Sequence, residues 1–307
     1  MRDWKQIISQ RFPNLSLPQI NGLATWSFGM VITRSNSLSK VSTIIAKINQ
    51  EKENTVRQRL KEWYKEGTAK AKNGNKRVSL DVKQCFPFLL AWLVDLLPQT
   101  TQKLLMALDA TNIGQHFTVL SINLLYRGSA IPVAWKIVKG TEKGSWKPYW
   151  HELLFSLKDI IPIVGQVIVA TEVGYALSQK GRGLYADWLF KAIIDVGWHP
   201  FLRINHQGLY RCSNSSNWQP LAKIAPHTGT NWTGKVTCFK TQPIDCTLLV
   251  RWEQAYTDPW LILTDLSPSD ADISWYGFRF WIECSYRDIK SDGWQWHKTR
   301  LRSPERA

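Results

Sequence analysis

The sequence predicts a mixed α/β fold in two parts, a helical region over residues 1–100 and an α/β domain over residues 101–307. Three observations lead to this prediction. Before about residue 100, apolar residues recur at helical spacing. From Leu104 onward, short apolar runs alternate with amphipathic stretches, as in a sheet covered by helices. A stretch rich in Asn, Ser, Thr, Gly and Trp then interrupts this alternation at about residues 205–258, where we expect a β-rich insertion.

Composition favours a polyanionic partner. The chain has 307 residues, which is enough for two or three domains with a sizeable core. Its 39 Lys and Arg residues exceed its 24 Asp and Glu residues by 15, and the sequence pI is about 9.6. An excess of this size makes nucleic acid the leading candidate partner.

Cysteine usage and hydropathy indicate a cytoplasmic protein with no membrane partner. The five cysteines are odd in number and form no C-x-x-C pair, so we expect reduced thiols rather than a disulfide or zinc framework. The first residues lack the apolar core of a signal peptide. The most apolar run, Phe86 to Leu97, is short and interrupted by Pro87 and Asp95, so it predicts a buried helix rather than a membrane span.

Two short helices in the N-terminal region fit a helix-turn-helix. Ser37 or Ser39 can cap the first, whose apolar residues follow helical spacing: Val41, Ile44, Ile45 and Ile48. The second, Thr55 to Tyr64, carries the candidate DNA-contacting residues Arg57, Arg59 and Lys61. A plain helical hairpin with a solvated basic face is the alternative. The basic segment Gly67 to Arg77 then predicts a mobile loop able to lie along a phosphate backbone.

The order of elements after Leu104 is that of a ribonuclease-H-like α/β domain. Three strands come first, followed by a helix, a strand, a helix, a strand and a late helix. The expected strands and helices before the insertion are 104–110, 117–126, 131–138, 146–160, 167–171, 185–196 and 201–204. Within the insertion, strand-like runs lie at 235–241 and 247–252. A return strand at 260–265 leads from the insertion to the late helix at 276–290.

The late helix carries the strongest chemical pattern. On a regular α-helix, the side chains of Tyr276, Arg279, Glu283 and Lys290 share an arc of roughly 60°, opposite an apolar face. A carboxylate between two cations and a phenol can hold a divalent metal while its neighbours bind phosphate oxygens. A solvated face with an Arg279–Glu283 pair is the structural alternative.

This pattern resembles a known family. The spacing Y-x2-R-x3-E-x6-K is similar to the Y-R-E-K motif of the cut-and-paste DDE transposases of bacterial insertion sequences, and Gly293 to Arg300 resembles its continuation in one branch. The resemblance runs from about Leu104 to the end of the chain. It implies a bacterial, cytoplasmic, nucleoid-associated protein that binds double-stranded transposon ends and target DNA. It also implies two Mg²⁺ (or Mn²⁺) ions. The resemblance further allows a homodimer that holds the paired ends.

Asp109 is the first expected acid. It ends the first predicted strand, where sites in α/β folds usually lie, although a lone strand-end Asp is more often a turn cap. By resemblance, Asp109 and Glu283 correspond to the first and third metal-binding acids. Tyr276, Arg279 and Lys290 would hold the terminal phosphates.

The second acid departs from the family pattern of a strand followed at once by D-R-G. Here Glu172 follows the strand, whereas the segment most similar to D-R-G-L-Y places Gly181 at the acid position. Asp187, on the next helix, is a weaker third candidate. The chain also stops at Ala307, where the family usually continues. The sequence therefore leaves two main functions open, an active transposase or a DNA-binding remnant that cannot cut. A metal-dependent nuclease of another pathway is a weaker third.

Two tryptophans of the insertion complete the candidate residues. Trp218 or Trp232 could stack on a base flipped out at the transposon end. A role in the core is the more ordinary interpretation of either indole.

Overall fold

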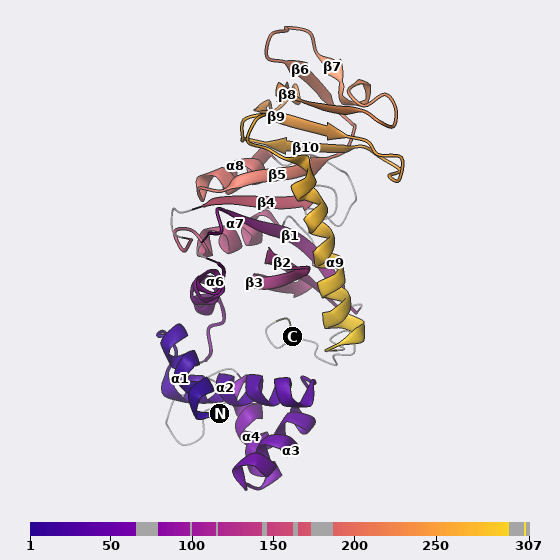
Figure 1. Cartoon of the computed structure of the whole chain (residues 1–307). Coiled ribbons are helices and arrows are strands. Elements are labelled where there is room, and N and C mark those ends of the chain that lie inside the picture. The colour runs from indigo at the N-terminus through magenta and orange to yellow at the C-terminus, as the bar shows by residue number, and fades with distance from the viewer. Residues whose placement is uncertain are drawn as a thin grey trace. The chain divides into compact units, whose positions relative to one another are not determined.

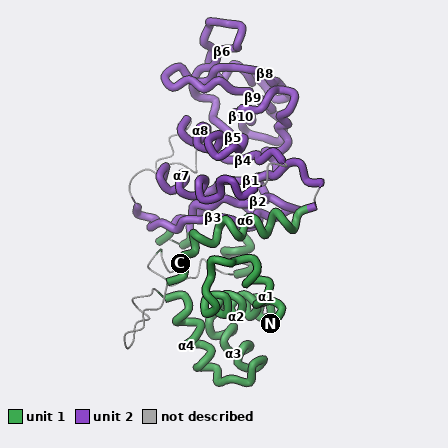
Figure 2. The backbone as a smooth tube through the Cα atoms, turned by 90° about the vertical axis from the view of Figure 1, so that its left-hand side faces the viewer, with its two compact units in different colours: residues 1–97, 113–117, 286–307 green, residues 98–112, 118–285 purple. Residues whose placement is uncertain are grey.

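The protein is described by a computed structural model that covers residues 1–65, 79–98, 100–114, 116–142, 146–161, 165–172, 187–294 and 304. The chain forms two compact units (Figure 2). A helical unit comprises residues 1–97, 113–117 and 286–307, and an α/β unit comprises residues 98–112 and 118–285. The predicted loop at 67–77 and the disturbed motif around Gly181 lie outside the described residues.

The helical unit has two small hydrophobic cores. Ile8, Phe12 and Ile20 centre the first core, and Val41, Ile45 and Leu60 centre the second. The helices are α1 (Arg2–Arg11), α2 (Leu17–Thr33), α3 (Leu38–Asn49), α4 (Glu53–Trp63), the 3₁₀ turn η1 (Lys83–Cys85) and α6 (Phe86–Asp95).

A capping box starts helix α2. The Gln19 side chain accepts a hydrogen bond from the Ser16 backbone N–H at 2.8 Å, and Pro18 occupies the first turn, where its missing N–H is not needed. These contacts satisfy groups that a helix start otherwise leaves open, so the start of α2 is specified locally.

The two helices predicted as a helix-turn-helix are present with a short connection. Helix α3 ends where Gln50 adopts a left-handed conformation, and α4 begins at Glu53. The predicted apolar face of α3 (Val41, Ile44, Ile45 and Ile48) is only partly buried. Ile48 is 47% exposed, whereas Ser42 and Ala46 are buried beside Val41 and Ile45. The helix therefore turns a face centred on positions 41, 42, 45 and 46 inward.

Helix α6 forms where the apolar run predicted it. Phe86 and Leu90 are fully buried, and Leu96, just past its end, is 64% exposed. Among the described helices, none is both long and apolar enough to cross a membrane.

The α/β unit is built on one mixed sheet of ten strands (Figure 1). The strand order is β3-β2-β1-β4-β5-β10-β9-β8-β6-β7. The mixed α/β class predicted from the sequence is therefore confirmed. The strands are β1 (Lys103–Ile113), β2 (Phe117–Tyr126), β3 (Ser129–Lys139), β4 (Gln166–Glu172), β5 (His199–Ile204), β6 (Leu209–Cys212), β7 (Gln219–Pro220), β8 (Asn231–Cys238), β9 (Ile244–Arg251) and β10 (Trp260–Thr264).

The central strands run parallel. Strand β4 pairs in parallel with β1 on one side and with β5 on the other. Such connections need crossovers, which α7 (Lys147–Ser156) and α8 (Asp187–Asp195) supply between β3 and β4 and between β4 and β5. The carboxyl ends of β1, β4 and β5 therefore meet along one edge of the sheet.

The insertion extends this sheet. Strands β8 and β9 form a long antiparallel pair, and β9 joins β10, which in turn pairs antiparallel with β5. The expected strands at 235–241 and 247–252 lie a few residues earlier, at 231–238 and 244–251. The expected β-rich insertion is present between β5 and β10.

The late helix is not one regular α-helix. Residues 273–279 form a 3₁₀ segment, η3 (Ile273–Arg279), followed by α9 (Phe280–Arg287) and a π-helical turn, η4 (Asp288–Asp292). Asp272 caps η3 by accepting the Ser274 backbone N–H at 2.9 Å. The uniform 100° spacing assumed from the sequence is therefore wrong for Tyr276, Arg279 and Lys290.

Candidate active site around Asp109 and Glu283

Asp109 lies inside a central strand, not at its end. Strand β1 continues four residues further, to Ile113, which corrects the expectation of a strand-end acid. The residue is 8% exposed in a strand that is largely buried, between neighbours β2 and β4. Burying a carboxylate is costly without a partner, so its surroundings must supply a compensating charge.

Arg279 supplies that charge and also reaches Glu283. Its Nη2 donates to Asp109 Oδ1 at 3.4 Å, and its Nη1 donates to Glu283 Oε1 at 3.3 Å. The Asp109 and Arg279 side chains are 12% and 13% exposed, whereas that of Glu283 is 58% exposed. One guanidinium thus connects a buried and an accessible carboxylate.

The change from 3₁₀ to α-helix aligns the three motif residues. In a 3₁₀ segment, residues three apart lie directly above one another, which aligns Tyr276 with Arg279. Glu283 follows Arg279 by one α-helical turn. These three side chains therefore lie on one face, as predicted, but through a 3₁₀ turn followed by an α-helical turn rather than through one regular α-helix.

Tyr276 is more deeply buried than a solvated polar face implies. It is 5% exposed and packs in a core with Ile168, Phe201, Leu249 and Ile262. Its ring lies edge-on to Trp260, with the ring centres 5.1 Å apart. The packing of this ring anchors η3 against the sheet and so positions the turn that carries Arg279.

A pocket of about 430 Å³ adjoins these residues. Three groups line it: the motif side chains, the aromatic rings of Tyr256 and Trp260, and a second arginine, Arg203, from β5. The Tyr256 and Trp260 rings are stacked, with centres 4.9 Å apart and planes 29° from parallel. Two cations, two carboxylates (Asp258 and Glu283) and flat aromatic rings therefore share one cavity.

Several lining residues were missed in the sequence. Arg203, Tyr256 and Trp260 come from a strand, a connection and the return strand, and no short motif links them. Trp260 could have been predicted from its position, because it begins strand β10, which leads directly into the motif segment. Trp218 and Trp232 do not line this pocket in the described structure; Trp218 instead lies under the Arg211 guanidinium at 5.2 Å.

The backbone of Glu172 lies close to this site. The β1–β4 register pairs Ala107 with Ala170, so Asp109 and Glu172 each lie two residues beyond the same pair. On the other side, Glu172 pairs with Arg203 of β5. The structure describes Glu172 by its backbone alone, and residues 173–186 lie outside the described part. Asp187, the weaker candidate, pairs with Lys191 on α8 at 3.5 Å.

The described acids do not form a complete metal centre by themselves. Within the described residues, no group of three His, Cys, Asp or Glu side chains is placed to hold a metal ion. Asp109 and Glu283 nevertheless converge on one positive group, and their oxygens are the ligand type that Mg²⁺ and Mn²⁺ prefer. The donor types therefore suit a divalent ion, whose remaining oxygen ligands would come from other groups.

Lys290 has a different environment from the other motif residues. It lies in η4, and its ammonium group is 5.5 Å from the centre of the Tyr286 ring. The continuation of the motif at 295–300 lies outside the described residues.

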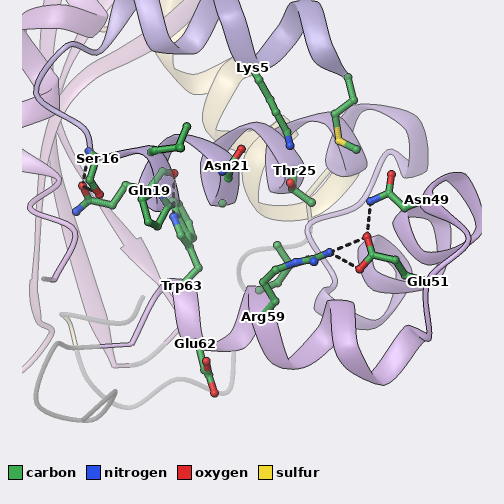
Figure 3. A pocket seen from close by; sticks show the side chains of 15 residues that line it. Lys5, Ser16, Gln19, Asn21, Thr25, Asn49, Glu51, Arg59, Glu62 and Trp63 are labelled. Atoms are coloured by element: carbon green, nitrogen blue, oxygen red, sulfur yellow. Dashed lines mark hydrogen bonds and ion pairs between the residues drawn. The ribbon is translucent and has the colours of Figure 1, made fainter. Parts of the chain in front are cut away.

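The three candidate basic residues of α4 face different ways. Arg57 and Lys61 are exposed and lie one helical turn apart. Arg59 instead forms an ion pair with Glu51 at 2.9 Å, and Asn49 donates to the same carboxylate (Figure 3). This ion pair lines a cavity of about 830 Å³ in the helical unit. All three side chains are exposed, and Arg59 is distinguished by its ion pair with Glu51.

Compared with models of known protein families and with curated proteins, the chain has no match in either set.

Proposed function

We propose that this protein is a DNA transposase of the DDE class, which binds transposon ends, nicks them with divalent metal ions and joins the 3′ ends to target DNA. The observation that carries the proposal is the convergence of Asp109 and Glu283 on Arg279. These acids are far apart in sequence, and the family pattern assigns both to the metal site. The sheet order β3-β2-β1-β4-β5, with parallel β1, β4 and β5, supports a ribonuclease-H-like core.

Asp109, Glu283 and a third acid would hold the metal ions. Glu172 is the candidate third ligand because its backbone lies at the level of Asp109 in the neighbouring strand. When bound, two Mg²⁺ or Mn²⁺ ions supply activation of the attacking oxygen and stabilisation of the leaving oxygen. Glu is one methylene longer than Asp, and Mg²⁺ requires near-ideal octahedral geometry, so Glu172 would be an imperfect ligand.

The pocket beside the acids would receive a nucleotide at the DNA end. Arg203 and Arg279 supply charge for phosphate oxygens, and Tyr256 and Trp260 supply rings on which a base can stack. Tyr256 and Trp260 are thus better placed for stacking than Trp218 and Trp232. Lys290, with Arg57 and Lys61 of α4, would contact the backbone of the double-stranded DNA. A homodimer on paired ends and a bacterial cytoplasmic location belong to the same proposal.

Nicking of the element's own ends tests this proposal. Purified protein with Mg²⁺ or Mn²⁺ should nick a duplex carrying those ends at a low rate, because the second acid is displaced from the family pattern, and Asp109→Asn or Glu283→Gln should each reduce this rate at least about a hundredfold. Glu253→Gln, which removes a carboxylate paired with Arg251 at an exposed site, is the matched control and should retain the rate. Nicking that persists in both acid variants would contradict the assignment.

A second function is favoured by the disturbed second acid. In this alternative the protein is a transposase remnant that binds DNA ends without cutting them. Retardation of the end duplex with no nicking at any Mn²⁺ concentration would identify it.

A further inference from the structure

The position of Arg279 has a consequence for metal binding, if Asp109 and Glu283 are metal ligands as proposed above. A divalent ion bound at about 2.1 Å from Asp109 Oδ1 would lie within about 5.5 Å of the Arg279 Nη2 atom, because that nitrogen is 3.4 Å from the same oxygen. By the same reasoning, an ion bound to Glu283 Oε1 would lie at a similarly short distance from the Arg279 Nη1 atom. Like charges this close repel strongly, and the repulsion is poorly screened where the side chains are 12% and 13% exposed.

The contacts of Arg279 with the two acids are longer than typical ion-paired hydrogen bonds. Charge-assisted N–H···O bonds are typically about 2.7–2.9 Å long, whereas the contacts of Arg279 with Asp109 and Glu283 measure 3.4 and 3.3 Å. One nitrogen of the guanidinium faces each carboxylate, Nη2 toward Asp109 and Nη1 toward Glu283. A single cation therefore lies against both acids.

The guanidinium also has an adjoining space. Arg279 and Glu283 line the pocket of about 430 Å³ that contains the stacked Tyr256 and Trp260 rings. Aromatic faces stabilise a displaced guanidinium, and so do the phosphate oxygens of a bound nucleotide. Movement within this pocket would release both acids without unfolding the turn.

We infer that Arg279 is a built-in counter-ion that competes with divalent metal for Asp109 and Glu283. Metal binding exchanges one cation for another at the two carboxylates, and the guanidinium moves toward the pocket. Before metal binds, the ion pairs hold the acids in place and limit their repulsion. The metal affinity of the unaltered protein is therefore lower than its carboxylates alone would give.

Mn²⁺ binding tests this inference without any measurement of cleavage. Free Mn²⁺ is measured by electron paramagnetic resonance during titration of the full-length chain. Arg279→Gln, which removes the charge, should bind Mn²⁺ at least tenfold more tightly than the unaltered protein. Arg251→Gln is the matched control because it removes one exposed arginine from the same unit, and it should change the affinity less than twofold. Adding Asp109→Asn to Arg279→Gln should abolish the gain.

A second variant tests the inference if Arg279→Gln does not fold. Arg279→Lys keeps the charge but offers one compact ammonium in place of a fork, so it should give an intermediate affinity. Circular dichroism verifies that each variant is folded.

The outcomes separate this inference from the proposed function. Equal Mn²⁺ affinity in the unaltered protein and in folded Arg279 variants would show that Arg279 does not compete with the metal, and the proposed metal site would be retained. Mn²⁺ binding by none of the variants overturns both the competition and the proposed metal-dependent function. Binding that appears or strengthens when Arg279 is replaced, and requires Asp109, supports the inference.

Discussion

The Arg279 guanidinium lies 3.4 Å from the Asp109 carboxylate, although the two residues are 170 positions apart in the sequence. Asp109 comes from the first strand of the sheet and Arg279 from the last turn before α9. Their ion pair therefore ties the beginning of the α/β unit to its end and sets the geometry of the candidate site.

This ion pair should contribute measurably to stability. Asp109→Asn removes a carboxylate charge that pairs with the nearly buried Arg279, and we expect the free energy of unfolding to fall by about 2 kcal/mol. Urea unfolding followed by tryptophan fluorescence measures the change. Glu253→Gln breaks the exposed pair with Arg251 and should cost less than about 0.5 kcal/mol. Equal losses in the two variants would show that burial does not strengthen the Asp109 pair.

If the protein is the proposed transposase, strand cleavage by the unaltered chain should be weak because the second-acid motif is disturbed; in the remnant it is absent. Deleting Glu172 to Lys180 and replacing Gly181 by Asp restores the strand followed by D-R-G-L-Y. This variant should gain Mg²⁺- or Mn²⁺-dependent nicking, and Glu283→Ala should abolish the gain. Robust cleavage by the unaltered chain that is lost in Glu172→Ala would instead establish Glu172 as the second ligand. No gain in a folded repaired variant would place the defect elsewhere.

The basic residues of α4 should differ in their contribution to DNA binding. Replacing both Arg57 and Lys61 by Ala should weaken binding of duplex DNA and reduce the slope of log affinity against log salt by about 2, since each phosphate contact contributes about 0.9. Arg59→Ala should leave the slope nearly unchanged because Arg59 pairs with Glu51. Gel retardation at several salt concentrations measures both. Similar slopes in the two variants would mean that α4 does not contact the phosphates.

Gly22 should not tolerate a side chain. A Cβ atom at this position of α2 would lie 1.9 Å from Cδ1 of Trp63, whose Nε1 donates to the Gln19 carbonyl. Gly22→Ala should destabilise the protein by about 1–2 kcal/mol, because overpacking outweighs the gain of about 1 kcal/mol in helix propensity. Asn21→Ala, the neighbouring position, is the control for propensity alone. Thermal unfolding compares the two, and a stabilised Gly22→Ala would contradict this packing.

The cysteines should react at different rates. A hydrogen bond with Cys238, and then burial, raise the pKa of the Cys246 thiol well above its ordinary value of 9.0. Iodoacetamide should therefore label the half-buried Cys212 and Cys284 first, and Cys238 and Cys246 only on unfolding. Mass spectrometry of timed samples gives the order, and early labelling of Cys246 would contradict it.

The raised pKa also predicts a pH dependence of stability. The folded state keeps the Cys246 proton at a pH where the unfolded thiol has lost it. Its contribution is therefore complete below pH 9.0 and is lost as the pH rises through the folded-state pKa. Urea unfolding at about pH 8 and about pH 10 should show a smaller loss in Cys246→Val than in the unaltered protein. An equal loss in both would assign the alkaline effect to other groups.

The sequence by itself determined the class of the fold, the order of its elements and the spacing of its motif. Periodicity located β2 at its observed bounds and most other elements to within a few residues, because local burial repeats every two or 3.6 residues. It also identified Asp109, Arg279 and Glu283 as candidates. Only the tertiary structure decided that one guanidinium joins the two acids and that Tyr276 packs into the core. It also decided that Arg203, Tyr256 and Trp260 share the pocket with them. These relationships depend on which strands pair and on how η3 lies against the sheet. They are contacts between residues far apart in the chain, so the local spacing of residues could not predict them.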